Sequence, residues 1–507
     1  MKLAKSLLLG ATAAVVSVAA ANAADLPSRV KGPAVEYVKI CDWITAEGFY
    51  VIPGTDTCIR VGGYVRAQFD VRSTDKLFGA GPTAAGANSV IAQPGPVLAL
   101  VAPAGGAGTG TASRLAGSLG NFNANFAEGA QDAIGGTARG TIVLDARTRT
   151  SYGTLRALIA AEGNHKWGNQ NGGNPGTGTS GSSFGLDKAF IQWAGITAGR
   201  AESFFEFWDA YGDNTYVGIR GSANSSDLFA YTATFGGGFQ ATISVEDPIA
   251  RRNGSLQFTG TGPFFAPAVG NNLTASTNSG AKVPDVVGNL YVEQSWGQAQ
   301  VSGVYHQSRS ISSNFLPNPN TATLSKQVSG FAILGGVKIN LPMLAAGDFL
   351  LLQGVYARGA SSYLGVNGDA NAPVGGGGFR RQQADFTWNT ATGQTQKENG
   401  YNLIAELRHY WTPTIYQGAF GSYTRINSGS NAKAIDWTVG GIGNFTQYFI
   451  GTQLVWVPVK GFTIGVEGMY VNTKTDLAGG VNRTATPAGF STNVDSFIGR
   501  LRINRSF

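Results

Sequence analysis

The feature that most constrains this chain is a regular alternation of apolar and polar residues in short segments. In residues 59–71, Val61 and Phe69 fall on one face of a predicted strand and Arg66 on the other, because successive side chains of a strand point to opposite faces. Residues 497–507 repeat this pattern. A soluble antiparallel sheet can also alternate in this way, so the pattern predicts strands without deciding what surrounds them.

The alternation recurs along the rest of the chain. It is found at residues 139–149, 154–162, 187–193, 227–235, 239–247, 290–296, 299–306, 401–410 and 462–471. Helical patterns are few, and residues 204–211 are the best short candidate. Charged residues make up only 13% of the sequence, about half the roughly 25% of a soluble domain. The alternation and the scarcity of helical patterns therefore indicate an all-β protein, and the composition indicates that little of its surface is charged.

The connections between the predicted strands alternate between short and long. Seven short turns are expected at 151–153, 195–197, 236–238, 296–298, 341–347, 411–414 and 457–461. Eight long segments rich in Gly, Asn, Ser and Pro are expected at 74–138, 164–184, 203–226, 248–285, 308–326, 360–398, 427–444 and 473–493. These fifteen connections would join sixteen strands. Short periplasmic turns and long outer loops are typical of transmembrane β-barrels, whereas a sandwich gives no reason for such regular alternation.

The N-terminal residues have the pattern of a secretory signal peptide. Lys2 and Lys5 precede an apolar stretch that ends at the small-residue site Ala21-Asn22-Ala23, so cleavage is expected after Ala23. The alternative is an uncleaved anchor. No apolar run of 18 residues follows, so no transmembrane helix is predicted. We therefore expect a signal peptide at 1–23, an N-terminal periplasmic lead-in at 24–58 and a barrel at 59–507.

The cysteines and histidines limit the chemistry that the chain can support. An exported chain with an even pair of cysteines, Cys41 and Cys58, is expected to form one disulfide. His165, His306 and His409 are far apart in the sequence, so we expect no metal site and no cofactor. The 37 basic and 30 acidic residues are spread along the chain, which argues against a nucleic-acid partner.

Several stretches resemble the alphaproteobacterial porins, a branch of the general bacterial porins. Residues 30–42, 53–58 and 63–66 are similar to the N-terminal signature of that family, and Phe507 resembles the terminal signal for barrel assembly. The resemblance implies a sixteen-stranded barrel in the outer membrane, a homotrimer, passive diffusion of small hydrophilic solutes and ions, and a third long loop that folds inward. It also implies contact with outer-membrane lipid and lipopolysaccharide, and with the barrel-assembly machinery.

A porin selects solutes by pore width and wall charge, so the expected site is a constriction and not a catalytic centre. The arginines expected on the pore wall are Arg60, Arg66, Arg139, Arg147, Arg149, Arg156 and Arg200. The acids expected on the inward loop are Glu202, Glu206, Asp209 and Asp213, with Phe204, Phe205, Phe207 and Trp208 packing that loop against the wall. Opposed arginines and carboxylates would create a transverse field. The alternative is that these charges line the lumen away from the constriction, or are ordinary loop charges.

Other interpretations of the sequence remain open at this point. Six aromatic residues could form membrane-interface girdles or pack at a trimer interface, namely Tyr64, Trp193, Trp296, Trp456, Tyr470 and Phe507. A barrel hydrolase would need a serine, a histidine and an orienting group within reach of one another, and no such signature is evident. A substrate-selective channel would need a consecutive aromatic track in the lumen, whereas most aromatic residues fall on the outward face of the predicted strands. A surface-exposed adhesin on a barrel scaffold is compatible with the long loops.

Overall fold

The structure is a computed structural model. It describes residues 40–44, 48–73, 133–168, 181–208, 221–222, 224–258, 279–312, 324–366, 369–370, 381–382, 384–389, 392–430, 444–476 and 493–507. The chain divides into two compact units, Met1–Cys58 and Ile59–Phe507. The signal peptide expected at 1–23 lies outside the described residues. In the part of the chain that is described, no helix has the length and apolar character needed to cross a bilayer.

The described part of the first unit is organised around a disulfide. Cys41 and Cys58 are bonded, with their Cα atoms 6.1 Å apart, which confirms the expected pairing. The ring of Phe49 is almost fully buried against the two cysteines, and the amide of Cys41 donates to the carbonyl of Phe49 over 3.1 Å. The bridge therefore holds a small hairpin-like turn around β1 (Tyr50–Val51).

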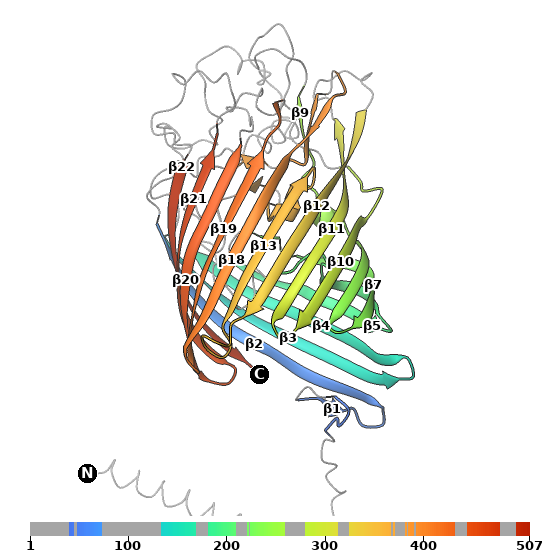
Figure 1. The fold of residues 1–507 in the computed structure, drawn as a ribbon, viewed down its shortest axis with the longest axis vertical. Coiled ribbons are helices and arrows are strands. Elements are labelled where there is room, and N and C mark those ends of the chain that lie inside the picture. The colour runs from blue at the N-terminus through green and yellow to red at the C-terminus, as the bar shows by residue number, and fades with distance from the viewer. Residues whose placement is uncertain are drawn as a thin grey trace, which may run out of the picture. The chain divides into compact units, whose positions relative to one another are not determined.

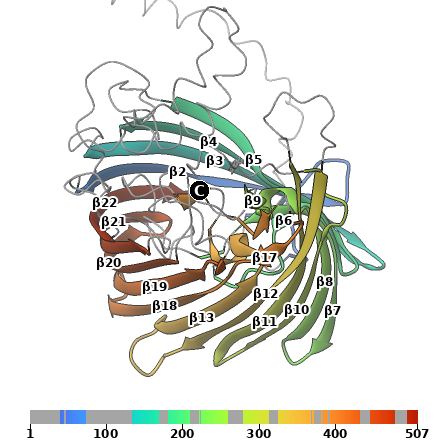
Figure 2. The same ribbon diagram turned by 90° about the horizontal axis from the view of Figure 1, so that it is seen from above.

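The second unit is a closed antiparallel barrel of sixteen strands (Figures 1 and 2). These strands are β2 (Thr57–Arg72), β3 (Ile134–Thr150), β4 (Gly153–Gly168), β5 (Gly181–Trp193), β6 (Ile196–Glu202), β7 (Ser225–Gly236), β8 (Phe239–Glu246), β10 (Asp285–Gln294), β11 (Gly297–Ser312), β12 (Leu324–Asn340), β13 (Phe349–Arg358), β18 (Asn399–Thr412), β19 (Ile415–Asn427), β20 (Phe445–Val459), β21 (Phe462–Thr475) and β22 (Asn493–Ser506). Each pairs with the next along the chain, and β2 pairs with β22 from Tyr64↔Ser506 to Arg72↔Ile498. This last pairing closes the ring, as the sequence predicted.

The connections alternate between short turns and long segments, which confirms the expected pattern. Several strands extend further toward the long connections than the alternation indicated, since β4 continues to Gly168 and β11 to Ser312. About ten residues of a tilted strand span the hydrocarbon layer. The remaining residues of a sixteen-residue strand can be polar on both faces, so periodicity does not mark where the strand ends.

The two faces of the barrel wall differ in the way that the alternation predicted. Along β2, Val61 and Val65 are about 60% exposed on the outer face, whereas Arg66 and Asp70 are buried on the inner face. One irregularity occurs where Ala160 and Ala161 of β4 face β5, because a bulge there adds one residue to β5. Such a bulge lets the alternation change phase within a strand.

Aromatic side chains form a continuous row on the outer face near the long-connection ends. It runs across consecutive strands through Tyr305, Phe331, Tyr356, Tyr401, Tyr423, Tyr448, Tyr470 and Phe497. Near the short turns, Trp193 packs edge-on against Tyr152, and Trp296 and Trp456 are exposed. Tyr64 instead lies on the inner face beneath the Arg66 guanidinium, 4.6 Å from the ring centre.

The described residues between the barrel strands include three strands of three or four residues and two 3-10 helices. They are β9 (Ser255–Phe258), β16 (Phe386–Asn389), β17 (Thr395–Lys397), η4 (Ile249–Arg251) and η5 (Ser361–Leu364). The two-residue strands β14 (Asp369–Ala370) and β15 (Arg381–Gln382) pair with each other in a separate ladder. Seen from above, β9 and β17 lie inside the ring of barrel strands (Figure 2). Parts of the connections 247–284 and 359–398 therefore occupy space within the ring.

Candidate functional site in the barrel lumen

The segment that follows β6 folds against the inner wall of the barrel, which confirms the inward-folded third connection. Phe205 is fully buried and packs with Val304 and Leu334 of the inner face. Trp208 is also buried, in a second cluster that includes Phe349 and other inward side chains. The aromatic residues thus bury the segment against the wall, at about 1.5–3 kcal/mol for a buried Phe side chain.

Hydrogen bonds from the wall fix the backbone of this segment. Asn289 donates to the carbonyl of Phe204 over 2.7 Å, and Ser302 to that of Phe205 over 2.7 Å. Gln300 donates to the carbonyl of Glu206 over 2.9 Å. A helix would need these carbonyls for its own amides, so the helix expected at 204–211 is wrong for residues 204–208, which form a turn at 204–205 and irregular backbone after it. Residues 209–211 lie outside the described part.

Trp208 is held by hydrogen bonds as well as by packing. Its amide donates to the side-chain oxygen of Gln353 over 3.0 Å, and its indole Nε1–H donates to Glu406 over 2.8 Å. Both partners point inward from the opposite strands β13 and β18. Trp208 therefore combines apolar packing with two polar contacts, which is the usual requirement for burying an indole.

The acidic residues expected on this segment have different environments. Glu206 is buried and forms an ion pair with Arg251 of η4. Glu202 ends β6, where its carboxylate lies 3.5 Å from the ammonium of Lys188. Asp209 and Asp213 lie outside the described residues. Glu206 is thus neutralised by a cation and turned away from open water, so it does not supply the exposed acid that the sequence suggested.

Burial acts in opposite directions on the pKa values of Glu206 and Arg251, although both pKa values are raised once the interactions with their partners are included. Burial raises the pKa of the Glu206 carboxyl, and the Arg251 guanidinium offsets only part of that rise. For Arg251, burial lowers the pKa, but the combined interactions with Glu206, Tyr363 and Glu246 leave the pKa above its usual range. Burial also raises the pKa of the Tyr363 hydroxyl, and the nearby Asp285 carboxylate raises it further.

Two clusters of arginine and carboxylate lie on the inner face of β3 and β4. Arg147 and Arg156 both bind the buried Asp145, at 2.9 Å and 3.0 Å. Arg139 binds Glu162 over 3.0 Å and forms a hydrogen bond with Asn164. The three arginine side chains remain about a quarter exposed. The first cluster carries one net positive charge and the second carries none.

A further basic cluster, of which the candidate wall residues included Arg66 alone, lies where β2 and β22 close the barrel. Arg500 forms an ion pair with Asp70, and Arg502 binds Gln68 over 2.8 Å. Next along the same pairing, Arg66 binds Asn504 over 3.2 Å. The alternation placed Arg500 and Arg502 on a polar face, but only the closure of the ring brings that face beside Arg66.

The other three predicted wall arginines occupy different positions. Arg60 and Arg149 share the inner faces of their strands with Arg66 and Arg147. Arg200 lies on the opposite face of β6 from the buried Ala201, and its guanidinium is 3.9 Å from Asp227 of β7. The structure therefore places Arg200 on the outer face of the barrel wall.

The buried histidine and serine near η5 have no arrangement suited to nucleophilic catalysis. His306 Nδ1 is 2.8 Å from Asp285, and its Nε2 is 3.6 Å from Asp385. The Ser361 hydroxyl donates to Asp385 and not to the imidazole. All four side chains are at most 4% exposed, so a substrate could not reach them.

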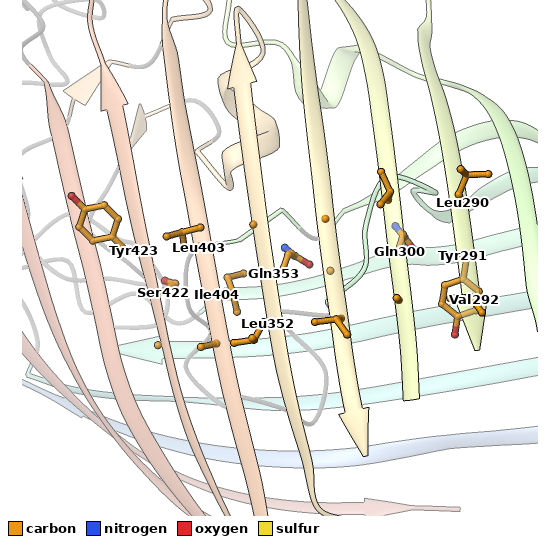
Figure 3. A pocket seen from close by; sticks show the side chains of 18 of the residues that line it. Leu290, Tyr291, Val292, Gln300, Leu352, Gln353, Leu403, Ile404, Ser422 and Tyr423 are labelled. Atoms are coloured by element: carbon orange, nitrogen blue, oxygen red, sulfur yellow. The ribbon is translucent and has the colours of Figure 1, made fainter. Parts of the chain in front are cut away.

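An apolar hollow with a volume of about 1180 Å³ lies on the outer wall, between side chains of several neighbouring strands (Figure 3). Its lining includes the outward side chains Leu290, Leu403 and Ile450. It also includes Gly335 and Gly354, which are paired across β12 and β13. The arginine and carboxylate residues of the lumen clusters are absent from its lining, and most of its side chains belong to the apolar outer surface.

Comparisons with known proteins agree with this architecture. The family model described as "Porin subfamily" matches residues 25–93 and 111–499. Porin Omp2b of Brucella suis is 29% identical over 305 residues, which cover 59% of this chain and 65% of that protein. Porin Omp2b of Brucella abortus (strain 2308) is 29% identical over 304 residues, which cover 59% and 64%. The chain thus spans just under two thirds of the length of these relatives.

Among solved structures, the outer membrane channel DcaP of Acinetobacter baumannii resembles this barrel. The TM-score is 0.53 at 11% sequence identity, and the match covers 90% of this chain and 99% of that chain. At this level of identity the likeness concerns the fold alone.

Proposed function

Because the chain belongs to the porin subfamily, we propose that it forms a water-filled channel for the passive diffusion of small hydrophilic solutes and ions across the outer membrane. A barrel of sixteen strands is too wide to be filled by the side chains of its own wall. The apolar outer face and the charged inner face suit a wall between lipid and water. The inward segment after β6 would narrow this passage.

The observation that carries the proposal is the charge of the inner wall over β22, β2, β3 and β4. The inward arginines there are Arg60, Arg66, Arg72, Arg139, Arg147, Arg149, Arg156, Arg500 and Arg502. The inward carboxylates on the same strands are Asp70, Asp145 and Glu162. Since Arg251 neutralises Glu206 on the inward segment, this excess of positive charge supports a preference for anions.

The remaining expectations about assembly belong to the same proposal. We propose a homotrimer that contacts outer-membrane lipid and lipopolysaccharide, and an exported precursor whose signal peptide is removed after Ala23. Phe507 exchanges backbone hydrogen bonds of 3.0 and 3.1 Å with Gly63, and its ring is 65% exposed. An exposed terminal aromatic residue would be accessible to the barrel-assembly machinery.

Planar-bilayer recording tests the channel function directly. Folded protein from native membranes should give ohmic conductance steps, and a salt gradient should give a reversal potential of the sign expected for anion preference. Folded barrels that insert but conduct no current would refute the channel. A reversal potential of the opposite sign would refute the assigned preference alone.

A further inference from the structure

We infer that Arg251 is a positioning residue of the channel, which reaches in from the connection 247–284 and holds the inward segment against the wall. This inference rests on the proposed function, because it concerns what fixes the width of the passage. Arg251 is 2% exposed and belongs to η4, far in sequence from the segment that it contacts. Neither the alternation pattern nor the resemblance assigned it a role.

The guanidinium of Arg251 joins both ends of the inward segment. At the beginning of that segment, it forms an ion pair with Glu206. At the end, its Nη1 donates to the hydroxyl of Ser222 over 2.6 Å. The Ser222 hydroxyl in turn donates to Glu206 over 2.7 Å. One side chain therefore brings Glu206 and Ser222 together at one buried point.

A second connection supports Arg251 from the other side. The guanidinium lies 4.4 Å from the ring centre of Tyr363 of η5, and that ring packs edge-on against Phe205 at 4.7 Å. The Tyr363 hydroxyl donates to Asp285 at the start of β10 over 2.6 Å. Burying a guanidinium is favourable only with such close partners. Tyr363 thus ties the inward segment, η4 and the barrel wall together.

The backbone after η5 also packs tightly against the end of the inward segment. Gly365 has a φ of +75°, and a Cβ added there would lie 2.6–2.7 Å from the backbone of Gly221. Only glycine fits both the left-handed conformation and this close approach. Gly221 is therefore held close to the backbone of Gly365, and the adjacent Ser222 is bound by the Arg251 side chain.

The turn that carries Arg251 is itself fixed by the connection 359–398. The amide of Asn253 donates to Asp385 over 2.9 Å, and its side-chain amide donates to Ser361 over 2.8 Å. Asp385 also accepts from the amide of Ser361. Because these contacts are buried, Arg251 cannot move away from Glu206 without breaking several hydrogen bonds. The position of the inward segment is therefore set by two other connections and not by the wall alone.

Single-channel recording of Arg251 variants tests this role. We expect Arg251→Gln to fold, to lose the stable open level of the unaltered protein, and to close at lower voltage with noisier current. Glu206→Gln should do the same. The current of the double variant, with both Arg251 and Glu206 replaced by glutamine, should be no noisier than that of the noisier single variant, since both changes break the same ion pair. Arg251→Lys should restore part of the stable level, because lysine keeps the charge but not the planar fork.

Arg358→Gln is the matched control, because Arg358 is an exposed arginine on the outer face at the end of β13 and lies outside this cluster. Folding of each variant is checked by its heat-dependent shift in gel mobility. If folded Arg251→Gln and Glu206→Gln conduct with unchanged noise and closing voltage, the inference is refuted. If Arg251→Gln fails to fold, Ser222→Ala and Arg251→Lys are recorded in its place. Current noise and closing voltage that are unchanged in both of these variants would refute the inference. Failure of the unaltered protein to conduct would instead refute the proposed function.

Discussion

Replacing Arg147 with glutamine should reduce the anion preference of the channel without disrupting the wall. Asp145 is fully buried, but it keeps its contacts of 3.0 and 3.1 Å to Arg156 when Arg147 is removed. No carboxylate is therefore left buried without a cation, which would otherwise cost about 3–5 kcal/mol. The cluster changes from one net positive charge to none.

The size of the effect follows from Coulomb's law with salt screening. A unit charge about 7 Å from a passing ion contributes about 0.6 kcal/mol in water. Screening lowers this to about 0.5 kcal/mol at about 0.01 M salt and to about 0.25 kcal/mol at about 0.15 M. The contribution has opposite signs for anions and cations. The ratio of anion to cation permeability should therefore fall about fivefold in the dilute salt and about twofold in the more concentrated salt.

Reversal potentials measured across salt gradients at both concentrations give this ratio. Arg200→Gln is the control, because it removes the same charge from the outer face of β6 and should leave the reversal potential unchanged. An unaltered reversal potential in the Arg147→Gln variant would show that the charge of Arg147 does not act on ions in the conduction path. A shift that does not grow as the salt is diluted would show that charge is not the cause.

Three other predictions concern stability and assembly. Leu334→Ala should destabilise the barrel by about 2–5 kcal/mol, measured as a lower midpoint of unfolding in detergent, because Leu334 is fully buried against the inward segment; an unchanged midpoint would contradict that packing. Unfolded, unreduced protein should not react with a thiol reagent at Cys41 or Cys58, whereas reduction should expose both thiols and slow gel mobility; reactive thiols before reduction would contradict the disulfide. Conductance in planar bilayers should appear in groups of three equal steps, and single independent steps would contradict the trimer.

The alternation of side chains predicted much of the barrel from sequence because each strand has one face in an apolar environment. The faces of β2 and β22 could be assigned in this way, since Val65 and Leu501 contrast with Arg66 and Arg500. The same reasoning could not assign Arg200. Its strand, β6, carries mostly small residues beside it, so the pattern has no apolar face to compare. The burial of Ala201 and the pairing with β7 in the structure show that Arg200 points outward.

The contacts of the inward segment depend on distant parts of the chain. Glu206 and Arg251 belong to different connections, 45 residues apart, and no local periodicity relates them. The aromatic residues of the segment were correctly expected to pack on the wall, because large apolar side chains in a polar loop need a surface to cover them. The helix expected there was wrong because inward amide and hydroxyl groups of the wall take the carbonyls that a helix would use.

The pairing of β2 with β22 has a consequence for how this chain folds. The two strands that complete the ring are separated by nearly the whole chain, so β2 presents an unsatisfied edge until β22 docks beside it. Exposed strand edges are templates for aggregation, and contacts of such long range form slowly. A chain that lacks the final fourteen-residue strand would leave two open edges, and we expect it to aggregate or be degraded before it could insert.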